Sequence, residues 1–163
     1  MQLERRHALL FLLCLPLTVG ASGLVLTPAQ KTEALDTHNR LRRSVSPSAA
    51  DMNFLTWNPY LEELAQQAAN RCVFEHNYNG PYQNLGENIY QGFRTNLTDI
   101  LTFFFMEKLA YDYPRKACDL SNSLNLKQCG HYIQLVGAAV SEVGCAIAEC
   151  ATNKFLMFCE YNR

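Results

Sequence analysis

Three segments of the chain carry apolar residues at helical spacing. In the first segment, Thr27 is a capping residue, Pro28 stands at the first helical position, and Gln30 stands where a capping box requires it. This pattern predicts a helix from residue 27 to about Arg43. The apolar side of that helix is sparse and consists of Ala34, Leu35, His38 and Leu41.

The second helix is predicted to begin at Asn58-Pro59 by the same logic and to extend to His76. Its buried face is marked by Leu61, Leu64, Ala65, Ala68, Ala69 and Cys72. Cys72 and His76 are four residues apart, which would place them on one side of this helix. A thiolate with its base would fit that spacing, but a disulfide beside an unrelated histidine is the favoured interpretation.

A third helix is predicted to be capped by Thr98, and it is apolar nearly all round, so other elements must cover it. Glu107 interrupts this apolar run. Periodicity alone slightly favours a solvated carboxylate at the helix edge over one held by a partner.

Three short apolar runs follow at residues 131–140, 143–150 and 154–161, each bounded by turn residues. We expect them to form an antiparallel sheet, with a further short strand at 84–90. The first two runs are apolar on both sides, so helices should cover both faces of the sheet. The predicted fold class is therefore α+β, an α-β-α sandwich with a small antiparallel sheet between helices.

The first 23 residues are typical of a secretory signal peptide. Arg5 and Arg6 precede an apolar core, and small residues around Ala21 to Gly23 offer a cleavage site. The apolar run is too short to span a bilayer. We therefore expect a secreted protein without a membrane span, whose mature chain is one domain over residues 24–163.

Charge and cysteine content narrow the possible functions. Loss of Glu4, Arg5 and Arg6 changes the formal charge from −1 to −2, which gives no basis for nucleic-acid binding. The mature chain keeps six of the seven cysteines: Cys72, Cys118, Cys129, Cys145, Cys150 and Cys159. In a secreted chain without a CxxC pair, they predict three disulfides rather than a thiol catalyst or a zinc-thiolate site. Spacing alone leaves fifteen pairings open, although a hairpin of the last two strands would bring Cys145 close to Cys159.

Candidate chemistry centres on the stretch 129–136, where His131 stands at the entrance of an apolar run. A buried imidazole needs a carboxylate, carbonyl, metal or second titratable group as its partner. The candidates along the chain are His76, Glu87 and Glu107. His38 is expected to be a core histidine whose hydrogen bonds are satisfied by the backbone.

Asn96-Leu97-Thr98 is an N-glycosylation sequon, which fits an exposed segment.

Three motifs in order resemble the CAP superfamily, which includes cysteine-rich secretory proteins, venom allergens and plant pathogenesis-related proteins. His38-Asn39-Arg40-Leu41-Arg42 looks like the HNxxR motif of the first helix, residues 86–89 like the GEN motif, and residues 129–134 like the CGHYTQ signature. The likeness covers most of the mature chain. It implies the α-β-α sandwich and a cleft where two histidines and two acids converge.

Carried over by position, the four cleft residues that the resemblance implies are His76, Glu87, Glu107 and His131. Residues 104–107 are similar to the family's WYxE, which favours a partnered role for Glu107. The resemblance also implies pairing of Cys72 with Cys150, Cys118 with Cys129, and Cys145 with Cys159.

The chain departs from the family pattern at several positions. Gly137 and Phe104 stand where the family has tryptophan, and Ile133 stands where it has threonine. The usual YxPxGN ending is missing after Cys159, as are the hinge and cysteine-rich tail of the larger venom members. These differences are expected to change the walls of the cleft, and they remove any expectation of ion-channel blocking by that tail.

Two functional hypotheses follow. The first is a non-enzymatic, monomeric extracellular module that binds a lipid, sterol or protein partner, with a weak divalent-metal site, Zn²⁺ for example, on His76 and His131. The alternative is a metal-dependent hydrolase or protease, or an immune-effector or protease-inhibitor-like protein that acts through its surface. No nucleophile with a base and no HExxH motif is visible, which favours binding over catalysis.

Overall fold

The last two apolar runs form antiparallel strands, as predicted, and they lie at the centre of the sheet. The structure is a computed structural model that describes residues 22–119, 121, 126–151 and 154–163. Strands β6 (Glu142–Cys150) and β7 (Lys154–Tyr161) form a hairpin in which Cys145 lies opposite Cys159. The predicted signal peptide lies outside the described residues except for Ser22 and Gly23.

Antiparallel strands flank this hairpin on both sides. Strand β3 (Gly86–Gly92) pairs with β7, and β1 (Ser22–Leu24) pairs with β6. The short β2 (Thr56–Trp57) adds a parallel pair to β6.

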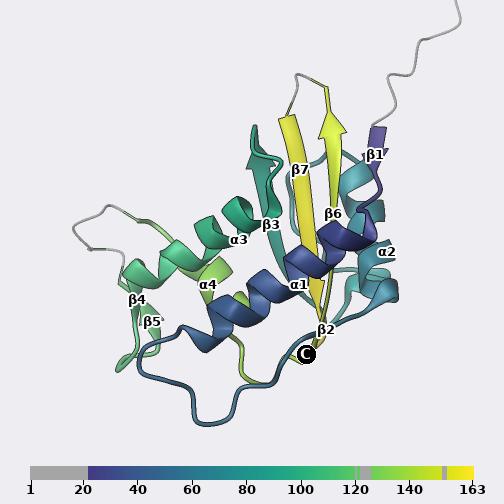
Figure 1. Ribbon diagram of the computed structural model, residues 1–163. Coiled ribbons are helices and arrows are strands. Elements are labelled where there is room, and N and C mark those ends of the chain that lie inside the picture. The colour runs from purple at the N-terminus through teal and green to yellow at the C-terminus, as the bar shows by residue number, and fades with distance from the viewer. Residues whose placement is uncertain (1–21, 120, 122–125, 152–153) are drawn as a thin grey trace, which may run out of the picture.

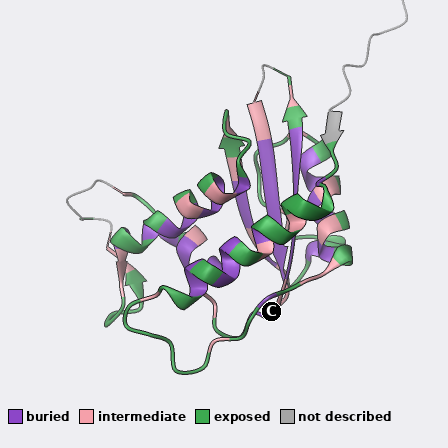
Figure 2. Ribbon diagram, viewed as in Figure 1, coloured by how far each residue is buried: buried purple, intermediate pink, exposed green. Residues whose placement is uncertain are grey.

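Helices cover both faces of the sheet. Because side chains alternate along β6 and β7, the core consists of two clusters, one on each face. Val143, Cys145 and Ile147 face one way and join the cluster that contains residues of α1 (Pro28–Arg43) and α3 (Leu97–Met106). Ala146 and Ala148 face the other way and pack against α2 (Pro59–Asn70). Figure 2 shows β6 and β7 buried along most of their length while the outer side of α1 is exposed. The expected α-β-α sandwich is confirmed (Figure 1).

Helix α1 begins as predicted. The Thr27 side chain accepts a hydrogen bond from the Gln30 backbone, and the Gln30 side chain accepts one from the Thr27 backbone. Helix α3, in contrast, begins two residues earlier than expected. Asn96 is its cap and accepts from the Asp99 N–H at 2.9 Å, whereas the Thr98 hydroxyl donates to Glu33.

Two further sequence predictions about local structure are wrong. Residues 131–140 do not form a strand, because α4 (Gly130–Leu135) and a turn occupy this segment. Tyr132 and Leu135 are its buried residues, and their spacing of three suits one helix face, a distinction that so short an apolar run leaves ambiguous. Helix α2 ends at Asn70, and Cys72 adopts a positive φ of 54°, so Cys72 and His76 do not share a helix face.

Short elements and disulfides complete the fold. They are the 3₁₀ turns η1 (Gly80–Tyr82) and η2 (Glu107–Ala110) and the small hairpin β4 (Tyr111–Asp112) with β5 (Ala117–Cys118). The disulfides join Cys72 to Cys150, Cys118 to Cys129 and Cys145 to Cys159, which is the pairing that the family resemblance implies. Within the described residues, no helix is both long and apolar enough to cross a bilayer.

Candidate functional site

A polar cleft of about 280 Å³ lies where the loop after α2, strand β3 and helix α4 meet. Three of the four predicted site residues, His76, Glu87 and His131, line it. The fourth, Glu107, is 4% exposed and contacts His131 directly. Other lining residues include Asn77, Tyr78, Asn88, Gln128, Gln134 and Arg163. The four predicted residues therefore form two histidine–glutamate pairs.

The first pair joins His76 to Glu87, with 2.6 Å between Nδ1 of the ring and Oε1 of the carboxylate. Asn77 donates two further hydrogen bonds to the same carboxylate, from its backbone N–H at 3.2 Å and from Nδ2 at 2.6 Å. The Glu87 side chain is only 6% exposed, whereas that of His76 is 40% exposed. The buried acid thus holds a ring that is accessible from the solvent.

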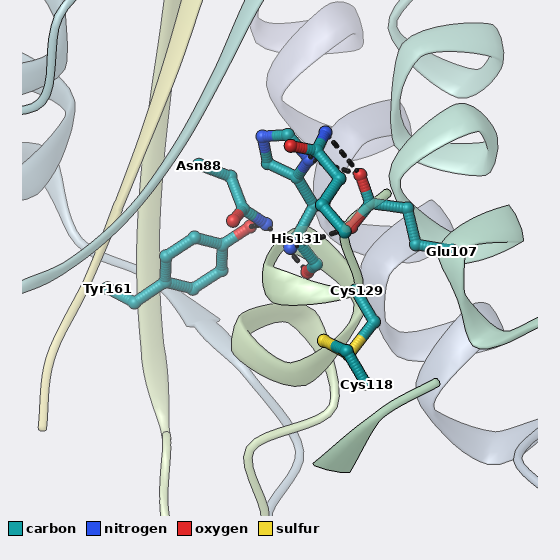
Figure 3. A network of polar contacts seen from close by, with 7 residues as sticks. Asn88, Glu107, Cys118, Cys129, His131 and Tyr161 are labelled. Atoms are coloured by element: carbon teal, nitrogen blue, oxygen red, sulfur yellow. Dashed lines mark hydrogen bonds and ion pairs between the residues drawn. A yellow bond between two sulfur atoms is a disulfide. The ribbon is translucent and has the colours of Figure 1, made fainter. Parts of the chain in front are cut away.

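The second pair joins His131 to Glu107 through two contacts. Nδ1 of the ring lies 2.6 Å from Oε1, and the His131 backbone N–H donates to Oε2 at 2.9 Å (Figure 3). Gln128 Nε2 also donates to Oε1, at 2.8 Å. Burial acts to raise the pKa of the Glu107 carboxyl, but the hydrogen bonds and charge of His131, together with the hydrogen bond from Gln128, outweigh it, so the pKa is lowered. Glu107 is therefore a partnered carboxylate and not a solvated helix edge.

Several elements fix the position of His131. The Cys118–Cys129 disulfide stands immediately before α4, and Phe104 from α3 stacks on the imidazole. Asn88 Nδ2 donates to the His131 carbonyl at 3.1 Å and to the Tyr161 hydroxyl at 3.3 Å. Figure 3 shows Asn88 and Tyr161 on one side of His131 and Glu107 on the other. The sheet and α3 thus position this histidine jointly.

His38 lies in the core, as expected, and not in the cleft. It is fully buried, its Nδ1–H donates to the Ala34 carbonyl at 2.8 Å, and its Nε2 accepts from the Tyr161 hydroxyl at 2.9 Å. Desolvation lowers the pKa of His38 to about 4. The ring is therefore neutral at physiological pH.

Within the described residues, one group of three metal-ligand types has its donor atoms within 4.8 Å of one another, namely His38, Cys145 and Cys159. The two cysteines are joined in a disulfide, and only a thiolate is a strong metal ligand. We therefore do not regard this group as a metal centre.

The two pairs in the cleft have a donor set that suits a metal better. Each glutamate occupies Nδ1 of its histidine, which leaves Nε2 as the ring nitrogen available to a ligand. Histidine ligands of zinc commonly have their second nitrogen held by a carboxylate in this way.

Sequence reasoning missed Glu160. This residue is 1% exposed and lies directly opposite Glu87 in the β3–β7 ladder. Because side chains alternate between the two faces of a strand, Glu160 projects from the opposite face of the sheet to its neighbours Cys159 and Tyr161. Its nearness to Glu87, however, depends on the pairing of β3 with β7, which no local pattern specifies.

Comparison with known proteins gives consistent matches. The model of the cysteine-rich secretory protein family matches residues 35–161. GLIPR1-like protein 1 of Homo sapiens is 33% identical over 163 residues, covering 92% of this chain and 64% of that protein. The Mus musculus protein of the same name is 34% identical, covering 78% of this chain and 57% of its own length. The chain thus spans less than two thirds of these relatives.

The fold of this chain resembles those of several solved structures. Schistosoma mansoni venom allergen-like protein 4 superimposes with a TM-score of 0.70 at 21% identity, covering 84% of this chain and 89% of that one. NaASP2, crystallised with Zn²⁺, gives a TM-score of 0.65 at 24% identity and covers 83% and 80% of the two chains.

Proposed function

The chain belongs to the cysteine-rich secretory protein (CAP) family, and from this premise we propose that it is a secreted, non-enzymatic binding module whose cleft takes a divalent metal. His76 and His131 are the proposed ligands, and Glu87 and Glu107 orient their rings. One observation carries the metal proposal: both imidazoles are held at Nδ1 by a buried glutamate at 2.6 Å. This leaves both Nε2 atoms for the metal.

A bound divalent metal would supply a positive charge and would connect the loop after α2 to helix α4. The solved structure of NaASP2 with Zn²⁺ supports the choice of metal, because that protein has the same fold. Two protein ligands make a weak site, since zinc sites in proteins usually have three or four.

The cleft supports binding better than catalysis. Among the described residues that line it there is no serine, threonine or cysteine that could act as a nucleophile. Both predicted acids already accept hydrogen bonds from a histidine, so neither is a free general base. The alternative of a metal-dependent hydrolase would require the metal itself to activate water.

A second cavity supports the proposal of a lipid or sterol as the partner. It measures about 280 Å³ and lies between the loop after α1 and helix α4. Its walls are largely apolar and aromatic, and they include Val45, Pro47, Met52, Tyr111, Tyr113, Tyr132 and Val136. Its volume is close to the lower limit for small-molecule sites, so it would hold only part of a sterol. A protein partner remains the second form of this proposal.

Titration calorimetry with zinc at pH 7.5 and 5.5 tests the metal site. We expect binding at pH 7.5 and weaker binding at pH 5.5, because protons compete with metal for imidazole. The His76→Ala, His131→Ala double variant should lose binding, and Glu75→Gln, an exposed neighbour of His76, should retain it. Equal affinity in the double variant would place the site elsewhere, and no binding to the wild type would refute the metal site.

Sterol and fatty-acid binding by the purified protein, measured with and without zinc, tests the partner. We expect saturable binding of at least one of these ligands and no hydrolysis of ester or peptide substrates. Zinc-dependent hydrolysis that disappears in the double variant would favour the enzyme alternative.

A further inference from the structure

Glu160 is a buried acid whose neighbours supply no hydrogen-bond donor. Its side chain lies on β7 directly opposite Glu87, and directly opposite residues in a sheet project from the same face. Among the described residues, no N–H or O–H donor reaches either carboxyl oxygen of Glu160. The side chain of Glu87 projects beside it from the paired strand β3.

The two acids differ in what surrounds them. Glu87 accepts three hydrogen bonds, one from His76 and two from Asn77. A carboxylate has about four acceptor positions, so Glu87 has room for one more donor. An ionised Glu160 would be a buried, unpaired charge beside a second negative charge, which is strongly unfavourable.

The nearest positive charge does not change this assignment. Arg71 acts on Glu160 electrostatically, but its guanidinium donates to Asn77 and stands over the Tyr82 ring. Arg71 therefore gives Glu160 no direct hydrogen bond, and Glu87 is the group left to contact it.

We propose that Glu160 is a positioning residue of the cleft, a neutral carboxylic acid that donates its O–H to Glu87 and so fixes the carboxylate that orients His76. One proton between the two acids satisfies both of them. The hydrogen bond occupies the remaining acceptor position of Glu87 and gives the orphaned carboxyl of Glu160 its partner. Desolvation, followed by the hydrogen bond and charge of Glu87, raises the pKa of Glu160 to about 9, in agreement with this assignment.

The proposal extends the site from two pairs to a chain of three groups, Glu160, Glu87 and His76. Its consequence for metal binding rests on the proposed function, whereas the hydrogen bond itself does not. The two are therefore tested by separate measurements.

The first measurement is the ¹³C chemical shift of the Glu160 side-chain carboxyl in wild-type protein at pH 7. We expect the value of a protonated acid for Glu160 and that of a carboxylate for Glu87. A carboxylate shift for Glu160 would overturn the proposal, whatever the result with zinc. This measurement needs no variant and no metal, so it remains decisive if the protein binds no zinc.

The second measurement compares two substitutions of similar size. Glu160→Gln keeps an N–H donor towards Glu87, and we expect it to retain zinc affinity within about twofold. Glu160→Leu removes the donor and should weaken zinc binding by about tenfold, as loss of a group behind a metal ligand does. Glu149→Leu is the matched control, because this exposed acid lies on the neighbouring strand β6.

The ¹⁵N spectrum of His76 gives a readout that general destabilisation would not change. We expect the tautomer with its proton on Nδ1 in wild type and in Glu160→Gln, and a mixture of tautomers in Glu160→Leu. If Glu160→Leu does not fold, Glu160→Gln and the carboxyl chemical shift of the wild type still test whether Glu160 is protonated and donates to Glu87. Wild-type behaviour of His76 in a folded Glu160→Leu variant would overturn the positioning role.

Discussion

The ring of Phe104 lies against the imidazole of His131, with centroids 4.4 Å apart and planes 23° from parallel. Phe104 is fully buried in α3, and three residues later the same helix region supplies Glu107, which holds His131 from another side. Phe104 stands at the position where the resemblance to the CAP superfamily implies a tryptophan. The smaller ring still provides an apolar wall for the histidine.

We predict that Phe104→Ala lowers the free energy of unfolding by about 3–5 kcal/mol, as expected when a large buried aromatic side chain is removed. Phe103→Ala is the control, because Phe103 is the preceding residue of the same helix but is 47% exposed. That variant should lose no more than about 1 kcal/mol. Urea denaturation followed by circular dichroism measures both changes. Similar losses in the two variants would contradict the burial on which this prediction rests.

A second prediction concerns the disulfide next to His131. Cys118–Cys129 and Cys145–Cys159 close loops of similar length, with separations of 11 and 14 residues. Replacing either pair by alanine should therefore lower stability by a similar amount, about 3 kcal/mol by loop entropy. Only the first pair adjoins the helix that carries His131.

Zinc calorimetry on both double-alanine variants distinguishes an effect on the site from an effect on stability. We expect affinity to fall when Cys118 and Cys129 are replaced and to stay near the wild-type value when Cys145 and Cys159 are replaced. A larger loss of zinc affinity in the Cys145 and Cys159 variant than in the Cys118 and Cys129 variant would show that the Cys118–Cys129 disulfide does not position α4.

The sequence predicts much of this fold because local signals and tertiary structure agree. The caps of α1 and α2 and the apolar runs of β6 and β7 have local causes, and each is present. Helix α4 was mistaken for a strand because six residues contain too few turns to establish a period.

The candidate site depends on long-range pairing, which local patterns do not encode. His131 and Glu107 are 24 residues apart in sequence. Residue chemistry made Glu107 one of three candidate partners of His131, and the family resemblance implied that the two residues converge. No motif of the family resemblance pointed to Glu160. Its contact with Glu87 follows from the register of β3 against β7 and was found only in the folded structure.

A third prediction concerns Asn96, which caps a helix and is also the asparagine of the predicted glycosylation sequon. Its Oδ1 caps α3 through the Asp99 N–H, whereas N-glycosylation would modify Nδ2. Asn96→Asp should keep the cap and lose the glycan, and Asn96→Gln should lose both. We expect glycosidase to shift only the wild-type protein secreted by eukaryotic cells. Asn96→Gln should be about 1 kcal/mol less stable than Asn96→Asp. Equal stability of the two variants would argue against the capping role.

The last prediction concerns two buried groups whose pKa values move in opposite directions. Desolvation lowers the pKa of His38 from 6.5 to about 4, so the unfolded chain binds the extra proton between these values. The stabilising contribution of neutral His38 is present above pH 6.5 and is lost as pH falls through this window. Desolvation raises the pKa of Glu160 from 4.5 to about 9, so its contribution is present below pH 4.5 and is lost as pH rises towards 9.

Between pH 5 and 7 each group contributes a change of about 2 kcal/mol, and the two changes have opposite signs. We therefore expect these two contributions to cancel nearly in the wild type. In His38→Gln only the acid remains, so stability should fall by about 2 kcal/mol relative to wild type as pH rises from 5 to 7. In Glu160→Gln only the histidine remains, and stability should rise by a similar amount. Urea denaturation at both pH values measures these differences, and two variants with the same slope would rule out the opposed titration.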